Sequence, residues 1–468
     1  MSADSRRRVC MFLYTPFRHD SRVLNEATAL VRCGHEVRVI ATLEPGAEPL
    51  EERDGVRIER LDADPLPSKA ARRVIELGGR LRRGSGASRG TAGVAAAPPS
   101  PGSLVPPAGG GLVGQGARVA LRAHLSLTYA KYLRRARRAA AAEPAAVWWA
   151  HDLDTLPVAV DAKRRLRGAV VYDSHELFVE TIAMATRAKV TRRGWRLAER
   201  RLIGASDRVV TTTQAAADEL VRRYAVARPT VVRNLRDPTA TGEPVVDRPP
   251  GSAPGGHLPR ELDLPAQSKL ALYVGGLSAG RGLEEMIQGA AHLDGVFLGL
   301  MGPSHEPYLQ ALKSLAARHG VAERIRFIPP VEARDVVRCA STADLGIVPI
   351  RNTCLNYYLS LPTKLFECIA AGLPVVTSDF PEMRRVVEEH RIGATCDPDL
   401  PADIARAVKW VLDEPERHEQ LRANARRAAR SLTWEREQTK LTELLRGLVP
   451  AGAGRHASAP PSGEAAPW

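Results

Sequence analysis

The stretch Leu361–Asp379 reads LPTKLFECIAAGLPVVTSD. Pro362 can begin a helix, because the N–H group that proline lacks is not needed in a first helical turn. The apolar run Pro374–Thr377, which follows a glycine, has the composition of a buried strand. A helix that leads directly into such a strand is a unit of a parallel α/β sheet.

Short apolar and β-branched runs alternate with helical patterns on both sides of this stretch. The first half has predicted strands at Val9–Tyr14, Glu36–Ala41, Val147–Ala150, Ala169–Tyr172 and Arg208–Thr212. The second half has them at Lys269–Val274, Gly295–Met301, Arg324–Ile328, Leu345–Pro349 and Pro374–Thr377. Continuously apolar strands separated by helices indicate parallel sheets covered on both faces. We therefore expect an α/β protein with two Rossmann-like, doubly wound domains that face a central cleft, where the strands' carboxyl ends bind ligands.

Composition shifts suggest where these domains begin and end. The sequence between Asp62 and Gly116 is rich in Ala, Gly, Pro and Ser, which bury too little apolar surface to fold. The expected parts are an N-terminal domain at 1–236 with a low-complexity insertion at about 62–117, a linker at 237–267, a C-terminal domain at 268–430, a helix at 431–449 that packs back on the N-terminal domain, and a disordered tail at 450–468.

The chain has 468 residues and a formal net charge of +14. Residues 62–145 hold 14 Lys/Arg against 4 Asp/Glu, so much of the basicity is regional. We find no nucleic-acid-binding signature, and we expect no nucleic-acid partner. The helical pattern that ends in RRARR is either an ordinary packed helix with a solvated basic end or a surface that touches anionic lipid. An anionic membrane or a phosphate-bearing substrate suits this region better than nucleic acid.

No apolar run approaches the roughly 20 residues needed to span a bilayer. The apolar run after SRRR at the N-terminus is too short for a signal peptide. The six cysteines have no C-x-x-C spacing, which favours reduced thiols over a zinc site or a disulfide framework. We expect a cytoplasmic protein, peripheral at most at the inner face of the plasma membrane.

A glycine-rich turn follows the strand Lys269–Val274. Its glycines are Gly275, Gly276, Gly280 and Gly282. Backbone N–H groups at the start of a helix near Leu283 favour an anion, and Arg281 can give a diphosphate a bidentate guanidinium. The alternative is an ordinary strand-to-helix connection, since glycine turns are common there.

Lys364 and Glu367 lie one turn apart in the predicted helix of the opening stretch. Lys364 can neutralise a phosphate while Glu367 accepts hydrogen bonds from a ribose diol. The alternative is a surface ion pair of a few tenths of a kcal/mol. Flanking apolar residues predict burial instead, and buried charge is costly without a partner or a use.

This segment resembles the donor-site signature of glycosyltransferase family 4 enzymes, which have the two-Rossmann GT-B fold. The resemblance implies a nucleotide-diphosphate sugar as donor, with Glu367 on its ribose and Leu365 also among the donor-binding residues. The first acidic residue of the family's E-x7-E motif would fall on Leu359, a departure shared by relatives with LPxKLFE. The family's first glycine-turn cation is also replaced, by Gly276, which leaves Arg281 and Lys364 as the cations for the diphosphate.

The segments WWAHDLDTLP and VVYDSHELF each place a histidine and acidic residues after an apolar strand. By resemblance, His151 lies beside the donor sugar and is catalytic with Arg281 and Lys364, whereas His175 and Glu176 lie on the acceptor side. A structural hydrogen bond is the alternative for each histidine. The Asp152–Asp154 D-x-D pattern is typical of a metal motif in another fold, and we expect a metal-independent enzyme without a cofactor.

The resemblance implies a retaining transfer to a hydroxyl of a glycan, a lipid-linked or a small-molecule acceptor, in envelope or exopolysaccharide synthesis. No carboxylate is clearly placed as a nucleophile, so the hypothesis is front-face attack with the departing diphosphate as base. Two alternatives stay open. One is a nucleotide-sugar 2-epimerase, which would need no acceptor, and the other is a non-catalytic sugar-nucleotide-binding protein.

Overall fold

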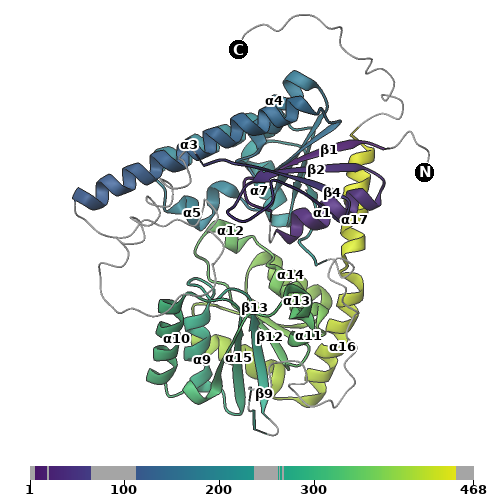
Figure 1. Ribbon diagram of the computed structural model, residues 1–468. Coiled ribbons are helices and arrows are strands. Elements are labelled where there is room, and N and C mark those ends of the chain that lie inside the picture. The colour runs from purple at the N-terminus through teal and green to yellow at the C-terminus, as the bar shows by residue number, and fades with distance from the viewer. Residues whose placement is uncertain are drawn as a thin grey trace, which may run out of the picture.

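The computed structural model describes residues 6–17, 20–64, 112–236, 262, 264–265 and 268–448. Most of the insertion expected at about 62–117, most of the linker at 237–267 and the tail at 450–468 lie outside the described residues. The described chain forms two α/β units, each built around its own sheet (Figure 1).

The first sheet has eight strands in the order β3-β4-β2-β1-β5-β6-β7-β8. Only β3 runs antiparallel to its neighbour; every other pairing is parallel. The strands are β1 (Arg8–Phe12), β2 (Glu36–Thr42), β3 (Leu50–Arg53), β4 (Val56–Leu61), β5 (Val147–His151), β6 (Ala169–Ser174), β7 (Arg208–Thr211) and β8 (Thr230–Val231). The chain order reverses between β1 and β5, a switch point of the kind that holds ligands at the strands' carboxyl ends.

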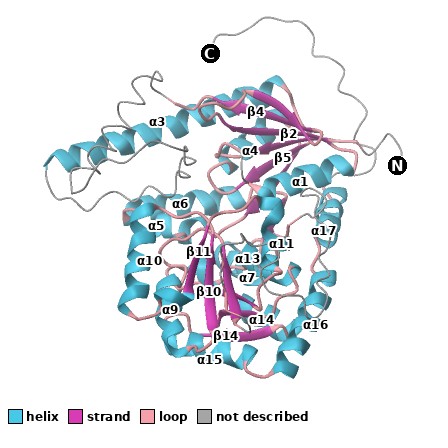
Figure 2. Ribbon diagram, turned by 60° about the horizontal axis from the view of Figure 1, so that its bottom comes forward, coloured by secondary structure: helices cyan, strands magenta, loops and turns pink. Residues whose placement is uncertain are grey.

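Helices cover this sheet on both faces (Figure 2). They are α1 (Ser21–Arg32), α3 (Leu112–Ala142), α4 (Leu156–Leu166), the short η2 (Phe178–Glu180), α5 (Ile182–Ala185), α6 (Lys189–Ile203) and α7 (Gln214–Tyr224). Side-chain caps define two of their starts, since Asp20 accepts from the Val23 N–H at 3.1 Å and Thr213 from the Ala216 N–H at 3.0 Å.

Helix α3 begins at Leu112, inside the range 62–117 that the glycine content assigned to the insertion. The expected end of the insertion was therefore a few residues too late. The physical reason is that a helix, once nucleated by its Ala- and Arg-rich later turns, extends at low cost into poorer helix formers.

The second sheet is entirely parallel and has the order β11-β10-β9-β12-β13-β14. Its strands are β9 (Lys269–Val274), β10 (Val296–Met301), β11 (Ile325–Ile328), β12 (Leu345–Val348), β13 (Val375–Ser378) and β14 (Gly393–Cys396). Its helices are α9 (Leu283–Gly289), η3 (Ala290–His292), α10 (Glu306–Arg318), η4 (Ala322–Arg324), η5 (Ala333–Asp335), α11 (Val336–Ala340), α12 (Leu355–Tyr358), α13 (Thr363–Ala370), α14 (Pro381–His390) and α15 (Pro401–Leu412). The order reverses between β9 and β12, which gives this sheet a switch point of its own.

The last two helices, α16 (Pro415–Ser431) and α17 (Trp434–Arg446), run from the second unit to the first (Figure 1). Helix α17 packs against α1, and Arg7 Nη1 donates to the carbonyl of Leu445 at 2.6 Å. The buried Glu437 carboxylate accepts from the backbone N–H of Arg233 at 3.0 Å. Helix α17 is thus part of the N-terminal unit in space.

Among the described residues, no helix combines the length and the apolar character needed to cross a membrane.

Candidate active site between the two sheets

A cavity of about 430 Å³ lies between the carboxyl ends of the two sheets. The first unit contributes residues that follow β5, β6 and β7, and the second contributes Arg281, Ile350 and the segment around α12 and the start of α13. The lining residues with polar side chains are Asp20, Arg22, Asp152, His175, Glu176, Thr212, Thr213, Asn234, Arg281, Asn356, Tyr357, Ser360 and Thr363. Polar groups from two switch points therefore converge on one space.

Asp152 lines this cavity directly after β5, and its backbone adopts a left-handed conformation with φ of 63°. Such a conformation is costly for a residue other than glycine and is concentrated at functional sites. Asp152 Oδ1 accepts from the backbone N–H of His175 at 3.2 Å. Burial raises the pKa of Asp152 to about 6, so this carboxylate titrates near neutrality.

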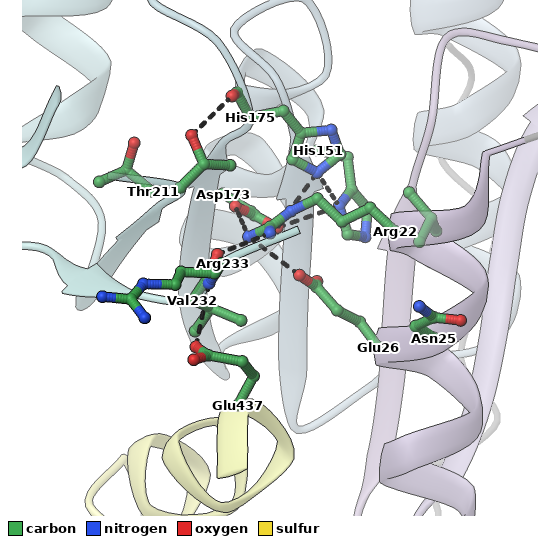
Figure 3. A network of polar contacts seen from close by, with 12 residues as sticks. Arg22, Asn25, Glu26, His151, Asp173, His175, Thr211, Val232, Arg233 and Glu437 are labelled. Atoms are coloured by element: carbon green, nitrogen blue, oxygen red, sulfur yellow. Dashed lines mark hydrogen bonds and ion pairs between the residues drawn. The ribbon is translucent and has the colours of Figure 1, made fainter. Parts of the chain in front are cut away.

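Beneath the cavity, Arg22 of α1 anchors the carboxylate of Asp173 at the end of β6 (Figure 3). Arg22 Nη2 donates to Asp173 Oδ1 at 2.9 Å, and its Nε donates to Oδ2 at 3.2 Å. A third bond, from Nη1, reaches the carbonyl of Val232 at 2.8 Å. Burial alone would raise the pKa of Asp173, but Arg22 and then His175 outweigh it and hold that pKa well below its usual range.

His175 lies between this anchored carboxylate and Asp152. Its Nε2 donates to Asp173 Oδ2 at 3.1 Å, and its Nδ1 is 3.5 Å from Asp152 Oδ2. Burial disfavours the imidazolium, but the two carboxylates outweigh it and raise the pKa of His175 to about 10. At neutral pH, His175 is therefore a charged hydrogen-bond donor at the wall of the cavity.

His151, expected beside the donor sugar, is the last residue of β5. It is fully buried, and its Nδ1 lies 3.0 Å from His175 Nε2. The reason is register: His151 is still within β5 and pairs with Asp173 of β6, whereas His175 is one residue beyond its strand. Burial lowers the pKa of His151, so it is a neutral ring that supports His175 from behind. His151 is not among the residues that line the cavity, whereas His175 is.

Glu26 completes the network from the next turn of α1. Its Oε1 is 3.0 Å from Arg22 Nη2, and its side chain is fully buried. Burial raises the pKa of Glu26 well above its usual range, although Arg22 opposes this. The Arg22 guanidinium thus faces two carboxyl groups, and the ionised one is that of Asp173.

Ligand atoms of His151, Asp173 and His175 lie within 4.8 Å of one another, which is close enough to hold a metal ion. The donor set is already occupied, since Arg22 donates twice to Asp173 and His175 is protonated at neutral pH. A metal ion would have to displace the Arg22 guanidinium and the extra proton on His175. The residues therefore fit a hydrogen-bonded network better than a metal centre. The D-x-D carboxylate of Asp154 is not part of this cluster.

The glycine turn after β9 carries Arg281, which lines the cavity from the second unit. Gly282 has φ of 75°, and a Cβ there would lie 1.9 Å from the carbonyl oxygen of Pro349. Gly275 has φ of 123°, and a Cβ there would lie 3.4 Å from Lys364 Nζ. The turn therefore packs its backbone against β12 and Lys364. Gly276 and Gly280 complete the turn, and helix α9 begins at Leu283, as the sequence predicts.

Arg281 extends from this turn into the cavity, with its guanidinium 5.0 Å from the ring centroid of Tyr357. No carboxylate in the described part of the chain forms an ion pair with Arg281. The charge is available for an anionic ligand, and Glu176 is within electrostatic range across the cavity.

Lys364, in the first turn of α13, is buried beside the glycine turn. Its Nζ donates to the hydroxyl of Tyr273 at 2.6 Å. Burial, followed by the nearby charge of Arg281, lowers the pKa of Lys364 to about 7. A diphosphate at the turn would favour the charged form of this lysine.

Glu367 lies one turn further along α13 and does not pair with Lys364. Its Oε1 accepts from Arg236 Nη2 at 2.7 Å, and Arg236 also donates to the carbonyl of Ala333. The two charged residues therefore have separate partners, and the surface ion pair considered from sequence is absent among the described residues. Leu365 between them is fully buried in the core and does not line the cavity, and its expected place among the donor-binding residues stays a prediction. The helical period turns its side chain away from the site.

Leu359, where the resemblance places the family's first acid, lines the cavity. Its carbonyl accepts from Thr213 Oγ1 at 2.9 Å and so joins the two units. Glu176, from the opposite unit, also lines this cavity. Burial raises the pKa of Glu176, and both His175 and Arg281 oppose this.

Several residues of the site were not expected from sequence, among them Arg22, Glu26, Asp152, Asp173, Arg236 and Tyr273. A charged residue within an apolar pattern was a signal for Asp173 in VVYDS and for Arg22 and Glu26 in the amphipathic α1. Arg236 had no local signal, because its partner is 131 positions away.

Two family models match the chain. Glycosyl transferases group 1 matches residues 257–428, and Glycosyl transferase 4-like domain matches residues 86–234. The chain belongs to the GT-B glycosyltransferases of the family 4 type.

Curated relatives and solved structures agree with this family 4 assignment. A D-inositol 3-phosphate glycosyltransferase of Thermomonospora curvata is 29% identical over 271 residues, which are 54% of this chain and 59% of the relative. One from Salinispora tropica is 27% identical over 302 residues, 60% of each chain. The aligned region thus spans about three fifths of the length of these relatives.

Solved structures match over nearly the whole chain. A sucrose-phosphate synthase from Thermosynechococcus elongatus superposes with a TM-score of 0.69, at 16% identity, over 95% of this chain and 99% of that one. Anabaena HepE in complex with UDP and glucose gives a TM-score of 0.65 at 15% identity, over 94% and 100%. At these identities the likeness shows the shared GT-B fold.

Proposed function

We propose that this chain is a retaining glycosyltransferase that moves a sugar from a nucleotide-diphosphate donor to an acceptor hydroxyl. The observation that carries the proposal is one cavity in which Arg281 from the second unit faces His175 and Glu176 from the first. Cations at one wall suit a diphosphate, and hydrogen-bonding groups at the other suit a sugar and an acceptor. A relative solved with UDP and glucose supports a nucleotide sugar as the donor.

In this proposal the donor diphosphate lies at the glycine turn, between Arg281 and Lys364. Both groups stabilise the leaving diphosphate as its charge grows, which is the main source of catalysis in such a site. The free oxygen of Glu367 accepts from the ribose diol, while Arg236 holds the other oxygen.

His175 is charged at neutral pH, so it donates hydrogen bonds and does not remove the acceptor proton. The departing diphosphate is then the base, as front-face attack requires. Glu176 supplies the carboxylate near the transferred sugar in place of the acid that Leu359 lacks. Asp152 and His151 hold His175 in position.

The acceptor that we propose is a glycan, a lipid-linked molecule or a small molecule used in envelope or exopolysaccharide synthesis. The basic region at 62–145 supports contact with anionic lipid at the inner face of the plasma membrane. At the end of α3, Arg134 and Arg138 are exposed, whereas Arg135 and Arg137 pair with acidic neighbours.

A thermal-shift screen of nucleotide sugars identifies the donor, since a ligand at 100 times its Kd stabilises a protein by about 2.7 kcal/mol. Turnover of that donor with and without acceptors then tests the proposal. Arg281→Ala and Lys364→Ala should each lower kcat by about 10²- to 10³-fold, whereas Arg318→Ala, an exposed arginine on α10, should leave kcat unchanged. Near-normal turnover in both cleft variants would overturn the assignment, and conversion of the donor without any acceptor would indicate an epimerase.

A further inference from the structure

A second concave surface lies on the N-terminal unit, between α6 and the C-terminal end of α7. Its volume is about 450 Å³, and its lining is Arg193, Arg196, Leu197, Arg200, Arg222, Arg223 and Tyr224. We call it the arginine groove. Helix α7 separates it from the catalytic cavity, since Thr213 at the start of α7 lines that cavity and Tyr224 at its end lines the groove. Eleven residues of helix correspond to roughly 16 Å.

The arginines come from two elements that converge. Arg193, Arg196 and Arg200 are spaced by three and four residues, which places them along one face of α6. Arg222 and Arg223 end α7 on the opposite side of the groove. Their convergence is a tertiary feature, because the two helices are separate in sequence.

Acidic residues neutralise this groove only in part. Glu180 Oε1 accepts from Arg196 at 2.7 Å and from Arg223 at 2.6 Å. Glu219 pairs with Arg222 at 2.7 Å and with Arg223 at 2.5 Å. Five guanidinium groups thus face two carboxylates, and in the described residues neither Arg193 nor Arg200 has an acidic partner.

Glu199 is the remaining carboxyl group nearby, and it is turned inward. It is buried, and its two oxygens accept from the hydroxyls of Tyr172 at 3.0 Å and Tyr224 at 2.5 Å. Burial raises the pKa of Glu199, which reduces the negative charge it can offer. The excess positive charge of the groove therefore has no internal counterpart.

Arginines in the last turn of a helix also stabilise the helix dipole, which accounts for Arg222 and Arg223 by themselves. The helix dipole does not account for Arg193, which lies in the first half of α6, or for the concave surface that the two helices share. Like charges gathered in a hollow repel one another, and an anion in the hollow would relieve that repulsion.

We propose that the arginine groove binds a phosphate-bearing anion. Planar guanidinium groups match phosphate oxygens two at a time. Arg193 and Arg200 have the most hydrogen-bonding capacity to spare, followed by Arg196, which donates to Glu180 through Nη2 alone. Arg223 is held in place by its ion pairs with both carboxylates. A free phosphate ester and the headgroup of an anionic lipid share this chemistry. The exposed Leu197 on the rim, with 49% of its surface accessible, is compatible with either. This site is independent of the proposed sugar transfer.

The test uses the full chain and two probes. Inorganic pyrophosphate is titrated by calorimetry into an Arg281→Ala background, which weakens binding at the catalytic cavity. Vesicles of phosphatidylcholine, with or without phosphatidic acid, are used in sedimentation. The groove variant is Arg193→Gln with Arg200→Gln. The matched control is Arg164→Gln with Arg201→Gln, which removes the same charge from exposed positions outside the groove.

We expect the groove variant to bind one of the two probes about tenfold more weakly, which is roughly the worth of one charge-assisted hydrogen bond, and the control to bind normally. Loss of pyrophosphate binding identifies a free phosphate ester as the ligand class, and loss of vesicle binding alone identifies a lipid headgroup. Equal binding of both probes by the groove variant and its control would overturn the proposal. Normal far-UV circular dichroism and melting temperature in both variants separate this effect from misfolding.

Discussion

Arg236 and Glu367 form an ion pair at 2.7 Å that ties the segment after β8 of the N-terminal unit to helix α13 of the second unit. Both side chains are largely shielded, with accessible fractions of 20% and 11%. The pair holds one oxygen of Glu367 and leaves the other for a ligand. Arg236 is thus placed to orient the residue that we propose for the ribose.

Replacing Arg236 tests this relationship. Arg236→Ala should weaken donor binding by about tenfold, because Glu367 loses a charge-assisted hydrogen bond and its fixed orientation. Isothermal titration with the donor measures the change, and Arg236→Lys should recover part of it. Arg228→Ala, which breaks an exposed pair with Asp218, is the control. Tighter donor binding in Arg236→Ala would instead mean that Arg236 competes with the ribose.

Lys364 predicts a pH dependence of donor affinity. Its pKa of about 7 in the free protein means that it loses its charge above neutrality, whereas a bound diphosphate requires the charge. The donor Kd should therefore rise with pH above 7, by up to about tenfold per pH unit. Titrations from pH 6 to 8.5 measure this. The slope should be lost in Lys364→Arg, whose side chain stays charged, and a flat wild-type profile would contradict the placement of the diphosphate.

The charged His175 predicts a pH-dependent contribution to stability. Its pKa of about 10 in the folded protein exceeds the value of about 6.5 expected in the unfolded chain. The folded state therefore binds more protons between pH 6.5 and 10, so this contribution is full below 6.5 and is lost as the pH rises to 10. The contribution of Lys364 to stability instead increases as the pH rises above 7, because its pKa is lowered in the folded protein.

The quantity to measure is accordingly the difference in the free energy of unfolding between the wild type and His175→Gln. Urea unfolding at several pH values should show that difference shrinking from pH 6.5 towards 10. A constant difference across the range would argue against an imidazolium between Asp173 and Asp152.

The glycine turn gives a matched pair of substitutions. Gly282→Ala should destabilise the protein by at least about 2 kcal/mol, because the new Cβ would lie 1.9 Å from the Pro349 carbonyl oxygen in a strained backbone conformation. Gly276→Ala should be tolerated, because nothing lies within 4 Å of its Cβ position. Denaturant midpoints compare the two, and equal midpoints would refute the packing of the turn against β12.

The two sheets could be predicted from the sequence because their central strands are buried on both faces and are therefore continuously apolar. Strands β3, β4, β8 and β14, which lie at the edges of the sheets or next to them, were missed. LEER and VRIERL alternate with charged residues at the exposed edge, and GATC is too short to show a pattern.

Candidate site residues could be named from the sequence where a local pattern marks them, as in the glycine turn with Arg281 and in Lys364 and Glu367. The difference in burial between His151 and His175 could not be predicted. Both histidines follow apolar runs, and only the pairing of His151 with Asp173 in the sheet shows which one is buried. Ion pairs that join distant segments, such as Arg22 with Asp173, leave no trace in local spacing.

The segment just before Arg236 lies beside α17, the helix by which the chain returns to the first unit. Lys440 of α17 donates to the carbonyl of Val231, and Glu437 accepts from the N–H of Arg233. These bonds hold together the two segments, before Arg236 and in α17, that connect the first unit to the second. A movement that opens the cavity would therefore break bonds across it, such as the one from Thr213 Oγ1 to the carbonyl of Leu359, and would leave these bonds intact.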